Sequence, residues 1–451
     1  MEIFTLTPPI AALAFAFATR NVVLSLMLGL ALSETLILRG NVLLAFPASL
    51  DRLIAVLSSP GNAAIILFCL LVGALIALMR ESGGIAATVE RLISSGAAST
   101  PRRASLATAI AGLVLFIETN ISLLTSGILG RPLFDRLELS RERLAYIIDA
   151  TCSPISVLIL INGWGAYALA LVSPHVGDEA VRVVAGSVPL NFYALGTLVL
   201  LFFTAWTGRV FGPMATVASH GQISDADIRP TKMTYMLVPT AILVFGTVGF
   251  MAWTGGGDIF EGSGAKSVLL AVSLAVIVLL LMLMADRSLA DGKATDVAFS
   301  GVADLLPATT VIFLAMALGA SLQELGTGVF IAGLAEVVPG AFAFPALIFL
   351  AASATSFAVG TSWGTYGILI PVAMPLALGA DIPPSLMLAA VLGGGVFGDH
   401  ASPISDTTLI ASLSAGCDHI DHVRTQLPYA LAAAGAASLL YLVAGVVTVG
   451  V

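Results

Sequence analysis

Long apolar runs separated by short polar loops make up most of this chain. A helix needs about 20 apolar residues to cross the hydrocarbon core of a bilayer. Seven runs come close to that length and are predicted to be transmembrane helices: 22–38, 62–80, 187–209, 234–253, 267–286, 303–323 and 427–448. The run 8–19 is too short to cross alone, and we expect it to form a bent pair with 22–38.

Two further stretches, 104–173 and 341–415, are apolar but interrupted by small polar residues, and they carry a repeat. The segment Ser-Pro-Ile-Ser stands at 153–156 and again at 402–405. Three more matches follow the same order at a spacing of about 240 to 250 residues: Ser122-x-x-Thr125 with Ser362-x-x-Thr365, Glu81 with Glu324, and Pro189 with Pro428. The chain therefore predicts two membrane repeats, 1–209 and 233–451, joined by a polar cytoplasmic linker, 210–232.

Basic residues predict how the repeats are oriented. Nine Lys and Arg residues lie in the loops at 131–143, 209–232 and 287–293, against two in the alternate loops. Positively charged loops remain in the cytoplasm, so the run 62–80 should end inside and its partner 303–323 should begin there. The fold class we expect is an all-α polytopic membrane protein with two inverted-topology repeats. Such repeats are typical of secondary transporters, whose binding site lies at the repeat interface.

Composition excludes several other classes of protein. Hydrophobic residues make up 58% of the chain and charged residues only 10%, against about 25% charged in soluble domains, which argues against a soluble enzyme. The net charge of −8 excludes a nucleic-acid binder with a basic face. The three cysteines lie far apart, so we expect no disulfide framework, metal knuckle or cofactor.

Each repeat is predicted to contain a re-entrant hairpin with a polar tip. The tips are Glu118 to Thr125 and Val359 to Thr365. Backbone that leaves the helix inside a membrane lines a cavity or is buried in protein, and its carbonyls, with Ser, Thr and Asn oxygens, suit a hard cation such as Na⁺. Packing of small residues between helices is the alternative, but the repetition favours an ion site.

Each repeat also contains a predicted broken helix, Asp149 to Ser156 and Gly398 to Thr408. Proline removes a backbone hydrogen bond and leaves carbonyls free near each acid. Intramembrane acids are costly and usually functional, which singles out Asp149, Asp399, Asp406 and, close behind, Glu118. Burial raises the pKa of a carboxyl group and a bound cation lowers it, so Na⁺ and a proton could compete for one acid. The alternatives are a helix cap at Asp149 and a structural pair at Asp399 and Asp406.

The sequence leaves alternative roles for several other polar and aromatic residues. His400 could relay a proton, contact a substrate or fix the helix break. The run Cys417 to Arg424 is interpreted as a cytoplasmic loop that caps the helix 427–448, in preference to a zinc site. Trp164 and Tyr167 are expected to anchor near the outer membrane interface, with a cavity wall as the alternative.

Two motifs resemble a known family. Gly398 to Thr408, followed by Gly416 to Val423, resembles the signature of the NhaC family of sodium/proton antiporters, and the two hairpin segments are similar to that family's. The resemblance covers about 60–448 and implies the ion-transporter superfamily, with inverted repeats, two hairpins, two broken helices and a homodimer. The superfamily includes sodium-coupled dicarboxylate carriers, in which sodium lies at the hairpin tips and helix breaks, and the resemblance implies the same places here. That implies Asn120, Ser122, Thr151 and Ser153 for one site, and Thr361, Ser362, Ser402 and Ser405 for its mirror.

The sequence therefore predicts a secondary transporter of the bacterial inner membrane, most simply an Na⁺/H⁺ antiporter. The alternative is Na⁺-coupled transport of a small carboxylate or amino acid, because the family also covers such carriers. The candidates for sodium binding are Asn120, Ser122, Thr125, Asp149, Thr151, Ser153, Ser156, Thr361, Ser362, Thr365, Asp399, Ser402, Ser405 and Asp406. Glu118, Asp399 and His400 are the candidates for the proton or the substrate. No constellation of a nucleophile with a base is evident, so we expect no enzyme, no metal other than Na⁺ and no nucleic-acid partner.

Overall fold

Every regular secondary-structure element in the described residues is a helix. The computed structural model describes residues 2–19, 21–94, 99–114, 116, 119–217, 231–259, 262–286, 293–327, 329–330, 340–403 and 405–449. The first half contains η1 (Glu2–Leu6), α1 (Thr7–Thr19), α2 (Val22–Ile37), α3 (Val42–Ser58), α4 (Pro60–Glu81), α5 (Gly84–Ser94), α6 (Pro101–Val114), α7 (Thr119–Arg136), α8 (Arg141–Ser156), α9 (Gly163–Val176), η2 (Gly177–Glu179), α10 (Ala180–Ser187), α11 (Phe192–Thr207) and η3 (Gly212–Ala215). The second half contains α12 (Thr234–Thr254), α13 (Gly264–Ala285), α14 (Lys293–Glu324), η4 (Ala341–Ala343), α16 (Phe344–Val359), α17 (Ser362–Gly379), α18 (Pro384–Ala401), α19 (Asp406–Ala415) and α20 (His419–Val449).

The helices are those of a multi-pass membrane protein. Within the described ranges, seven helices are long and apolar enough to cross a bilayer, or nine if each of two bent pairs forms one span. The sharp bend falls one helix later than the sequence predicted, because α2 and α3 meet at 116°. Arg39 (φ 53°) and Gly40 (φ 92°) form that turn in left-handed backbone, and Asn41 then caps α3 by accepting a hydrogen bond from Leu44.

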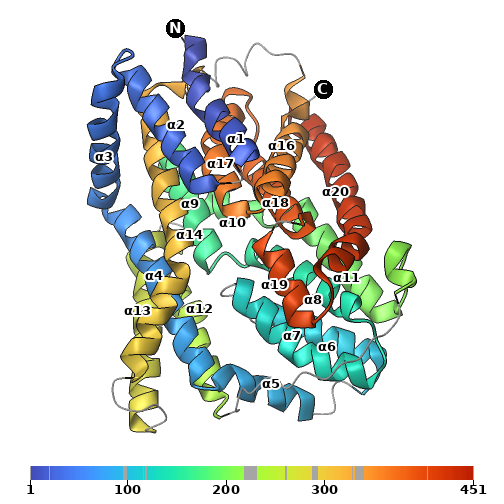
Figure 1. The fold of residues 1–451 in the computed structure, drawn as a ribbon. Helices are drawn as coiled ribbons and strands as arrows, with labels where there is room; N and C mark the ends of the chain where they lie inside the picture. Colours follow the sequence, from blue (N-terminus) through green and yellow to red (C-terminus); the bar gives the residue numbers. More distant parts are fainter. Residues whose placement is uncertain are drawn as a thin grey trace.

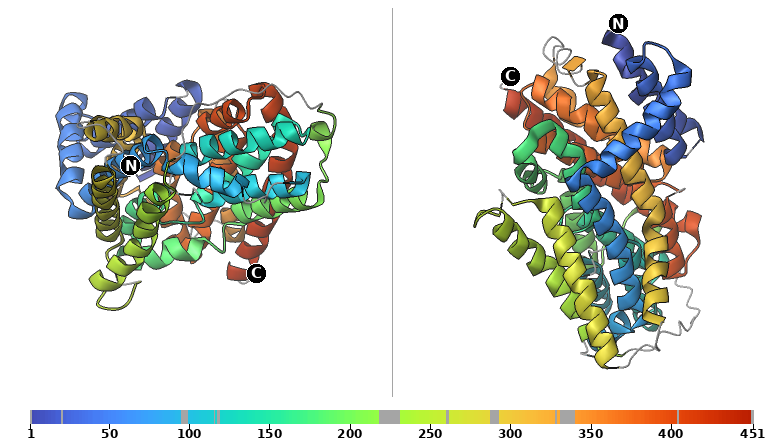
Figure 2. Two further views of the ribbon diagram at one scale, coloured as in Figure 1. Left: turned by 90° about the horizontal axis from the view of Figure 1, so that it is seen from below. Right: turned by 90° about the vertical axis from the view of Figure 1, so that its left-hand side faces the viewer.

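The core of the molecule contains a tight crossing of α4 with α14, and the two run side by side in Figure 2. Gly73 and Gly301 lie at the crossing, where a Cβ on either would overlap the carbonyl oxygen of the other. Glu81, at the end of α4, pairs with Lys293, at the start of α14, at 4.0 Å. The two helices are therefore antiparallel.

A second ion cluster joins the other end of α14 to the residues just before α4. Arg52 contacts the carboxylate of Glu34 on α2 at 2.8 Å and that of Glu324 at the end of α14 at 2.7 Å. Both ends of α14 thus have a charged contact, and the antiparallel packing of α4 with α14 agrees with the orientation predicted for this pair. The inversion of the complete repeats stays a prediction.

The order of elements repeats after α4 and after α14. In the first half, the helix pair α6–α7 precedes α8 and α9, which are separated by a break. In the second half, the pair α16–α17 precedes α18 and α19, which are also separated by a break. Figure 1 places α6 and α7 at the lower end of the molecule and α16 and α17 at the upper end. The two halves interlock, because α7 packs on α19 and α8 packs on α18, α19 and α20. The re-entrant path of the helix pairs stays a prediction.

Candidate functional site

The break after α18 lies directly against the α16–α17 pair. Gly398 allows the two helices to approach, since a Cβ there would overlap the backbone of α16 at Phe357 and Ser353. Ser402, in the break, donates a hydrogen bond to the Phe357 carbonyl at 2.7 Å. Gly360 (φ 77°) turns the chain between α16 and α17 in left-handed backbone. These contacts bring the start of α17 to the end of α18.

Asp399 is the centre of this arrangement and is 3% exposed. One carboxylate oxygen, Oδ2, accepts hydrogen bonds from the backbone N–H of Ser362 at 3.2 Å and from the hydroxyl of the same residue. The other, Oδ1, accepts from the hydroxyls of Ser405 and, at 3.2 Å, of Thr407. Thr408 donates to the Asp399 backbone carbonyl at 3.2 Å. We call Asp399, Ser362, Ser405 and Thr407 the Asp399 cluster.

The Asp399 cluster has the composition of a site for a hard cation. A hydroxyl group can donate a hydrogen bond to a carboxylate or turn its lone pairs toward a cation. These three hydroxyls can therefore contact the carboxylate when the site is empty and the cation when it is bound. Carboxylate and hydroxyl oxygens are the ligands that hard cations prefer. The site therefore combines one negative charge with three adaptable oxygens in a water-poor interior.

Asp149 has partners of a different kind, although it was predicted for the same role. Its side chain is fully buried on α8. Oδ1 accepts a hydrogen bond from Ser153 at 3.1 Å, and Oδ2 accepts from the Gln426 amide at 2.7 Å and lies 3.4 Å from Nε2 of His422. Amide N–H groups have no lone pair for a cation. We call Asp149, Ser153, His422 and Gln426 the Asp149 cluster.

Gln426 connects the two clusters. Its amide also donates to the backbone carbonyl of His400, the residue after Asp399. The ring of His400 contacts the hydroxyl of Tyr193 on α11 through Nε2 at 2.9 Å. A displacement of α20 would therefore be felt at both acids.

Among the described side chains of the first hairpin and its helix break, no cluster like that of Asp399 is formed. Ser122 donates to the Gly112 carbonyl at 3.0 Å, Thr151 donates to the Ile147 carbonyl at 2.6 Å, and Ser156 donates to the Ser153 carbonyl at 2.7 Å. These hydroxyls lie near the predicted place but satisfy helix carbonyls. Glu118 lies outside the described residues, and so do the side chains of Asn120, Thr125 and Asp406.

Two predicted threonines of the second hairpin lie beside the Asp399 cluster without joining it. Thr361 occupies the N-terminal cap position of α17, and the buried Thr365 donates to the Thr361 carbonyl at 3.1 Å. The Thr365 hydroxyl thus joins the first turn of α17 to its cap residue. Ser362 is thereby positioned with its backbone N–H toward Asp399.

Asn162 was missed by the sequence reasoning. Its side-chain amide donates to the carbonyls of Phe116, at 3.2 Å, and Ser156, at 2.8 Å, and its side-chain oxygen caps the start of α9. It thus joins the first hairpin to the first helix break. An asparagine before a glycine-rich helix start is the only local signal for such a cap.

Trp164 and Tyr167, predicted as anchors near the outer membrane interface, are both buried within the protein. The Trp164 ring stacks on Trp363, next to Ser362, with 3.9 Å between ring centroids, and its N–H donates to Thr119 at 3.1 Å. Tyr167 donates to the Trp363 carbonyl at 3.1 Å. The aromatic pair therefore packs the two halves together beside the Asp399 cluster.

The prediction of a loop over Cys417 to Arg424 was partly wrong, because α20 begins at His419. His419 closes the second helix break by contacting the Pro403 carbonyl at 2.7 Å. His422, one turn further, is fully buried. The polar spacing of His422 and Gln426, four residues apart on one helix face, was the missed signal. In the part of the chain that is described, no group of three His, Cys, Asp or Glu residues could hold a metal.

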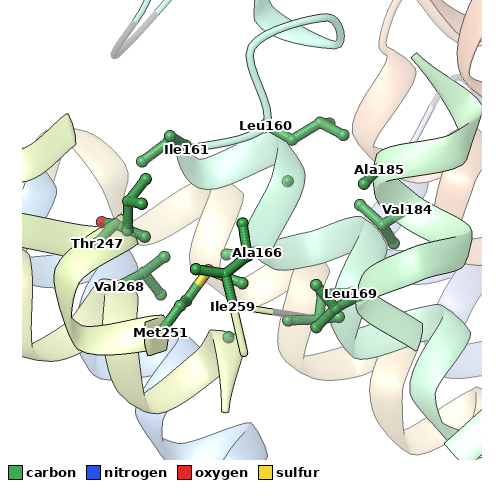
Figure 3. A pocket seen from close by; sticks show the side chains of 14 residues that line it. Leu160, Ile161, Ala166, Leu169, Val184, Ala185, Thr247, Met251, Ile259 and Val268 are labelled. Atoms are coloured by element: carbon green, nitrogen blue, oxygen red, sulfur yellow. The ribbon is translucent and has the colours of Figure 1, made fainter. Parts of the chain in front are cut away.

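A cavity of about 180 Å³ lies away from both clusters, between α9–α10 and α12–α13. Figure 3 shows its lining side chains, among them Leu160, Leu169, Val184, Met251 and Val268. This lining is almost entirely apolar. The cavity is unsuited to a bare ion, so the polar interior at Asp399 is the better candidate.

Comparison with known proteins identifies the family and the fold that this chain resembles. A family model described as "Na+/H+ antiporter family" matches residues 156–446. An uncharacterized protein of Haemophilus influenzae is 31% identical, over 98% of this chain and 91% of its own length. A malate-2H(+)/Na(+)-lactate antiporter of Bacillus subtilis is 37% identical, over 25% of this chain and 24% of its own. The structure of MtrF from Neisseria gonorrhoeae, described as illuminating a class of antimetabolite efflux pumps, superposes with a TM-score of 0.60 at 14% identity, over 88% of this chain and 84% of that one.

Proposed function

We propose that this chain, which belongs to the Na⁺/H⁺ antiporter family and is a secondary transporter, exchanges Na⁺ for protons across the membrane. One observation carries the proposal: the buried Asp399 carboxylate is surrounded by the hydroxyls of Ser362, Ser405 and Thr407. We assign Na⁺ to this cluster. The ion would replace the hydrogens that now point at the carboxylate, while the hydroxyl oxygens turn toward it.

The position of the cluster suits transport as well as binding. Its residues come from the start of α17 and from both sides of the break between α18 and α19. A small shift of α17 against α18 would change the number of oxygens around the ion, and with it the affinity. A carrier needs such a change, because it must bind the ion on one side and release it on the other.

The direct test uses purified protein in liposomes that contain a pH-sensitive dye. An Na⁺ gradient is imposed with the voltage clamped and no organic solute present. We expect a lumenal pH change that depends on Na⁺ and is absent from protein-free vesicles. If the protein binds ²²Na⁺ but moves no protons, the antiport proposal is wrong.

Ser362→Ala should weaken sodium affinity without unfolding the protein. The substitution removes one hydroxyl from the cluster and leaves the backbone N–H, so we expect ²²Na⁺ to bind about tenfold more weakly, equivalent to roughly 1.4 kcal/mol. The matched control is Ser353→Ala on α16, whose hydroxyl donates to the carbonyl of Phe349 in its own helix. Equal affinities in the two variants would remove Ser362 from the site.

A second candidate is Na⁺-coupled transport of a small organic acid. It is favoured by the similarity of one quarter of the chain to a protein named as a malate-2H(+)/Na(+)-lactate antiporter. Thermal-shift measurements with L-malate and L-lactate, each with and without Na⁺, separate the two. Stabilisation by an acid only in the presence of Na⁺ would favour this candidate.

We also propose the cytoplasmic membrane of a bacterium as the location. Support comes from the long apolar helices and from relatives in Haemophilus influenzae and Bacillus subtilis. Fractionation of cells that express the tagged protein, with inner and outer membranes separated by density, tests the location.

A further inference from the structure

The Asp149 cluster has no role in the sodium site, yet its acid is buried as deeply as Asp399. Three hydroxyls and one backbone N–H contact Asp399, whereas an amide, an imidazole and one hydroxyl contact Asp149. The amide nitrogen that contacts Asp149 has no lone pair for Na⁺, and a hard cation prefers oxygen ligands such as those around Asp399. An acid beside an imidazole in a membrane interior is instead an arrangement that can hold a proton.

Polar atoms without a protein partner surround the same acid. Nδ1 of His422, Oε1 of Gln426 and Nδ1 of His400 are buried, and none of them has a hydrogen-bond partner among the described residues. Buried polar groups are nearly always paired, and ordered water is the usual partner when protein supplies none. All three atoms belong to residues that contact one another or Asp149. These three atoms can therefore bind water molecules, which would connect Asp149 to solvent.

The ionisable groups around Asp149 come from every side. His422 contacts it from α20, Gln426 joins it to His400, the neighbour of Asp399 on α18, and Tyr193 on α11 contacts the His400 ring. On α8 itself, Tyr146 and Cys152 are buried one turn away. Two charged residues of α7, Arg131 and Asp135, contact the end of α19 and the start of α8 instead, and the third, Arg136, is the last residue of the helix. His422 is therefore the ionisable group in contact with the Asp149 carboxylate.

We propose that the Asp149–His422 pair carries the transported proton, while the Asp399 cluster carries Na⁺. This inference rests on the proposed function and deepens it, since it places the two ions on different carboxylates. A proton from water binds Nδ1 of neutral His422, and the Nε2 proton moves to Oδ2 of Asp149. The imidazole is then neutral again with its proton on Nδ1, and reversal of both steps returns the proton to water.

Gln426 provides a physical link through which binding at one site can affect the other. Its amide donates to Oδ2 of Asp149 and to the His400 carbonyl at the end of α18. Protonation of Oδ2 weakens its acceptance of that amide, which alters the contact with the residue next to Asp399. Occupation of one site therefore changes the geometry of the other without competition for a single acid.

The test separates sodium exchange from proton coupling in proteoliposomes. Counterflow, in which external ²²Na⁺ exchanges for internal Na⁺, requires the sodium site alone, whereas ²²Na⁺ uptake driven by a pH gradient requires both ions. For Asp149→Asn we expect counterflow within about twofold of the unsubstituted protein and pH-driven uptake reduced at least tenfold. The matched control is Asp178→Asn, an exposed acid in η2, which should preserve both.

His422→Gln is a second variant. If Asp149→Asn does not fold, the same two transport measurements are made on His422→Gln alone. It should preserve counterflow and shift the pH at which pH-driven uptake is half-maximal, which loss of packing alone would not do. Loss of counterflow together with uptake in Asp149→Asn would make Asp149 part of the sodium site. Full pH-driven uptake in both variants would place the proton elsewhere, and either result overturns the inference. Counterflow without pH-driven uptake in the unsubstituted protein would contradict the proposed function instead.

Discussion

Asp399→Asn is expected to abolish sodium binding and transport while the protein still inserts and folds. The substitution removes the one negative charge of the Asp399 cluster and places an amide N–H₂ where a carboxylate oxygen stood. The hydroxyls of Ser362, Ser405 and Thr407 can rotate to meet the amide, so folding should survive. Loss of a buried, hydrogen-bonded charge partner costs about 2 to 5 kcal/mol, so we expect ²²Na⁺ affinity to fall by a factor of about thirty or more.

The measurement is ²²Na⁺ binding to purified protein, with size-exclusion chromatography as the check of folding. Asp304→Asn on α14 is the matched control, because the Asp304 side chain is 61% exposed and its ion pair with Arg80 is long, at 3.9 Å. This control should bind sodium as the unsubstituted protein does. Wild-type affinity in Asp399→Asn would contradict the assignment of Na⁺ to the cluster, and with it the main support for the proposed function.

Gly301→Val is expected to have the largest effect on stability. A Cβ at position 301 would overlap the Gly73 carbonyl and lie 2.6 Å from the Cβ of Ala77 on α4. Relief of such a contact requires a backbone shift, because no flexible side-chain end can move aside. Overpacking typically costs about 1 to 3 kcal/mol, and a clash of two backbones should reach or exceed the upper end.

The measurement is the thermal unfolding midpoint in one detergent, followed by a cysteine-reactive dye. Gly435→Val on α20 is the control, since nothing lies within 4 Å of a Cβ there. We expect a clear fall of the midpoint for Gly301→Val and little change for Gly435→Val. Equal midpoints would show that α4 and α14 do not cross as closely as described.

Much of the architecture could be predicted from local sequence. The hydropathy of runs such as 62–80 and 267–286 marks a helix regardless of its neighbours, because a backbone in lipid must satisfy its own hydrogen bonds. The repeated Ser-Pro-Ile-Ser segment located the break after α18, but in the first half the prediction was wrong in detail, because Ser153 to Ser156 form the last turn of α8 and the break follows them. The helix α3 was missed because Pro47, Asp51 and Arg52 interrupt its apolar pattern. Arg52 is accommodated there by Glu34 and Glu324, and neither contact is visible from the run itself.

The residues of the candidate site also fall into those that local sequence could predict and those that it could not. Asp399, Ser362 and Ser405 could be nominated from the sequence, because a proline break beside an acid and hydroxyls is a local pattern that implies free oxygens. The partners of Asp149 could not, since His422 and Gln426 stand more than 270 residues away along the chain. The two acids have similar local motifs but different neighbours. Residue types close in sequence thus identified where ions could bind, whereas the packing of α20 against α8 and α18 determined which donors reach each acid. A buried carboxylate takes its chemistry from the groups that contact it, and helix packing brings those groups together.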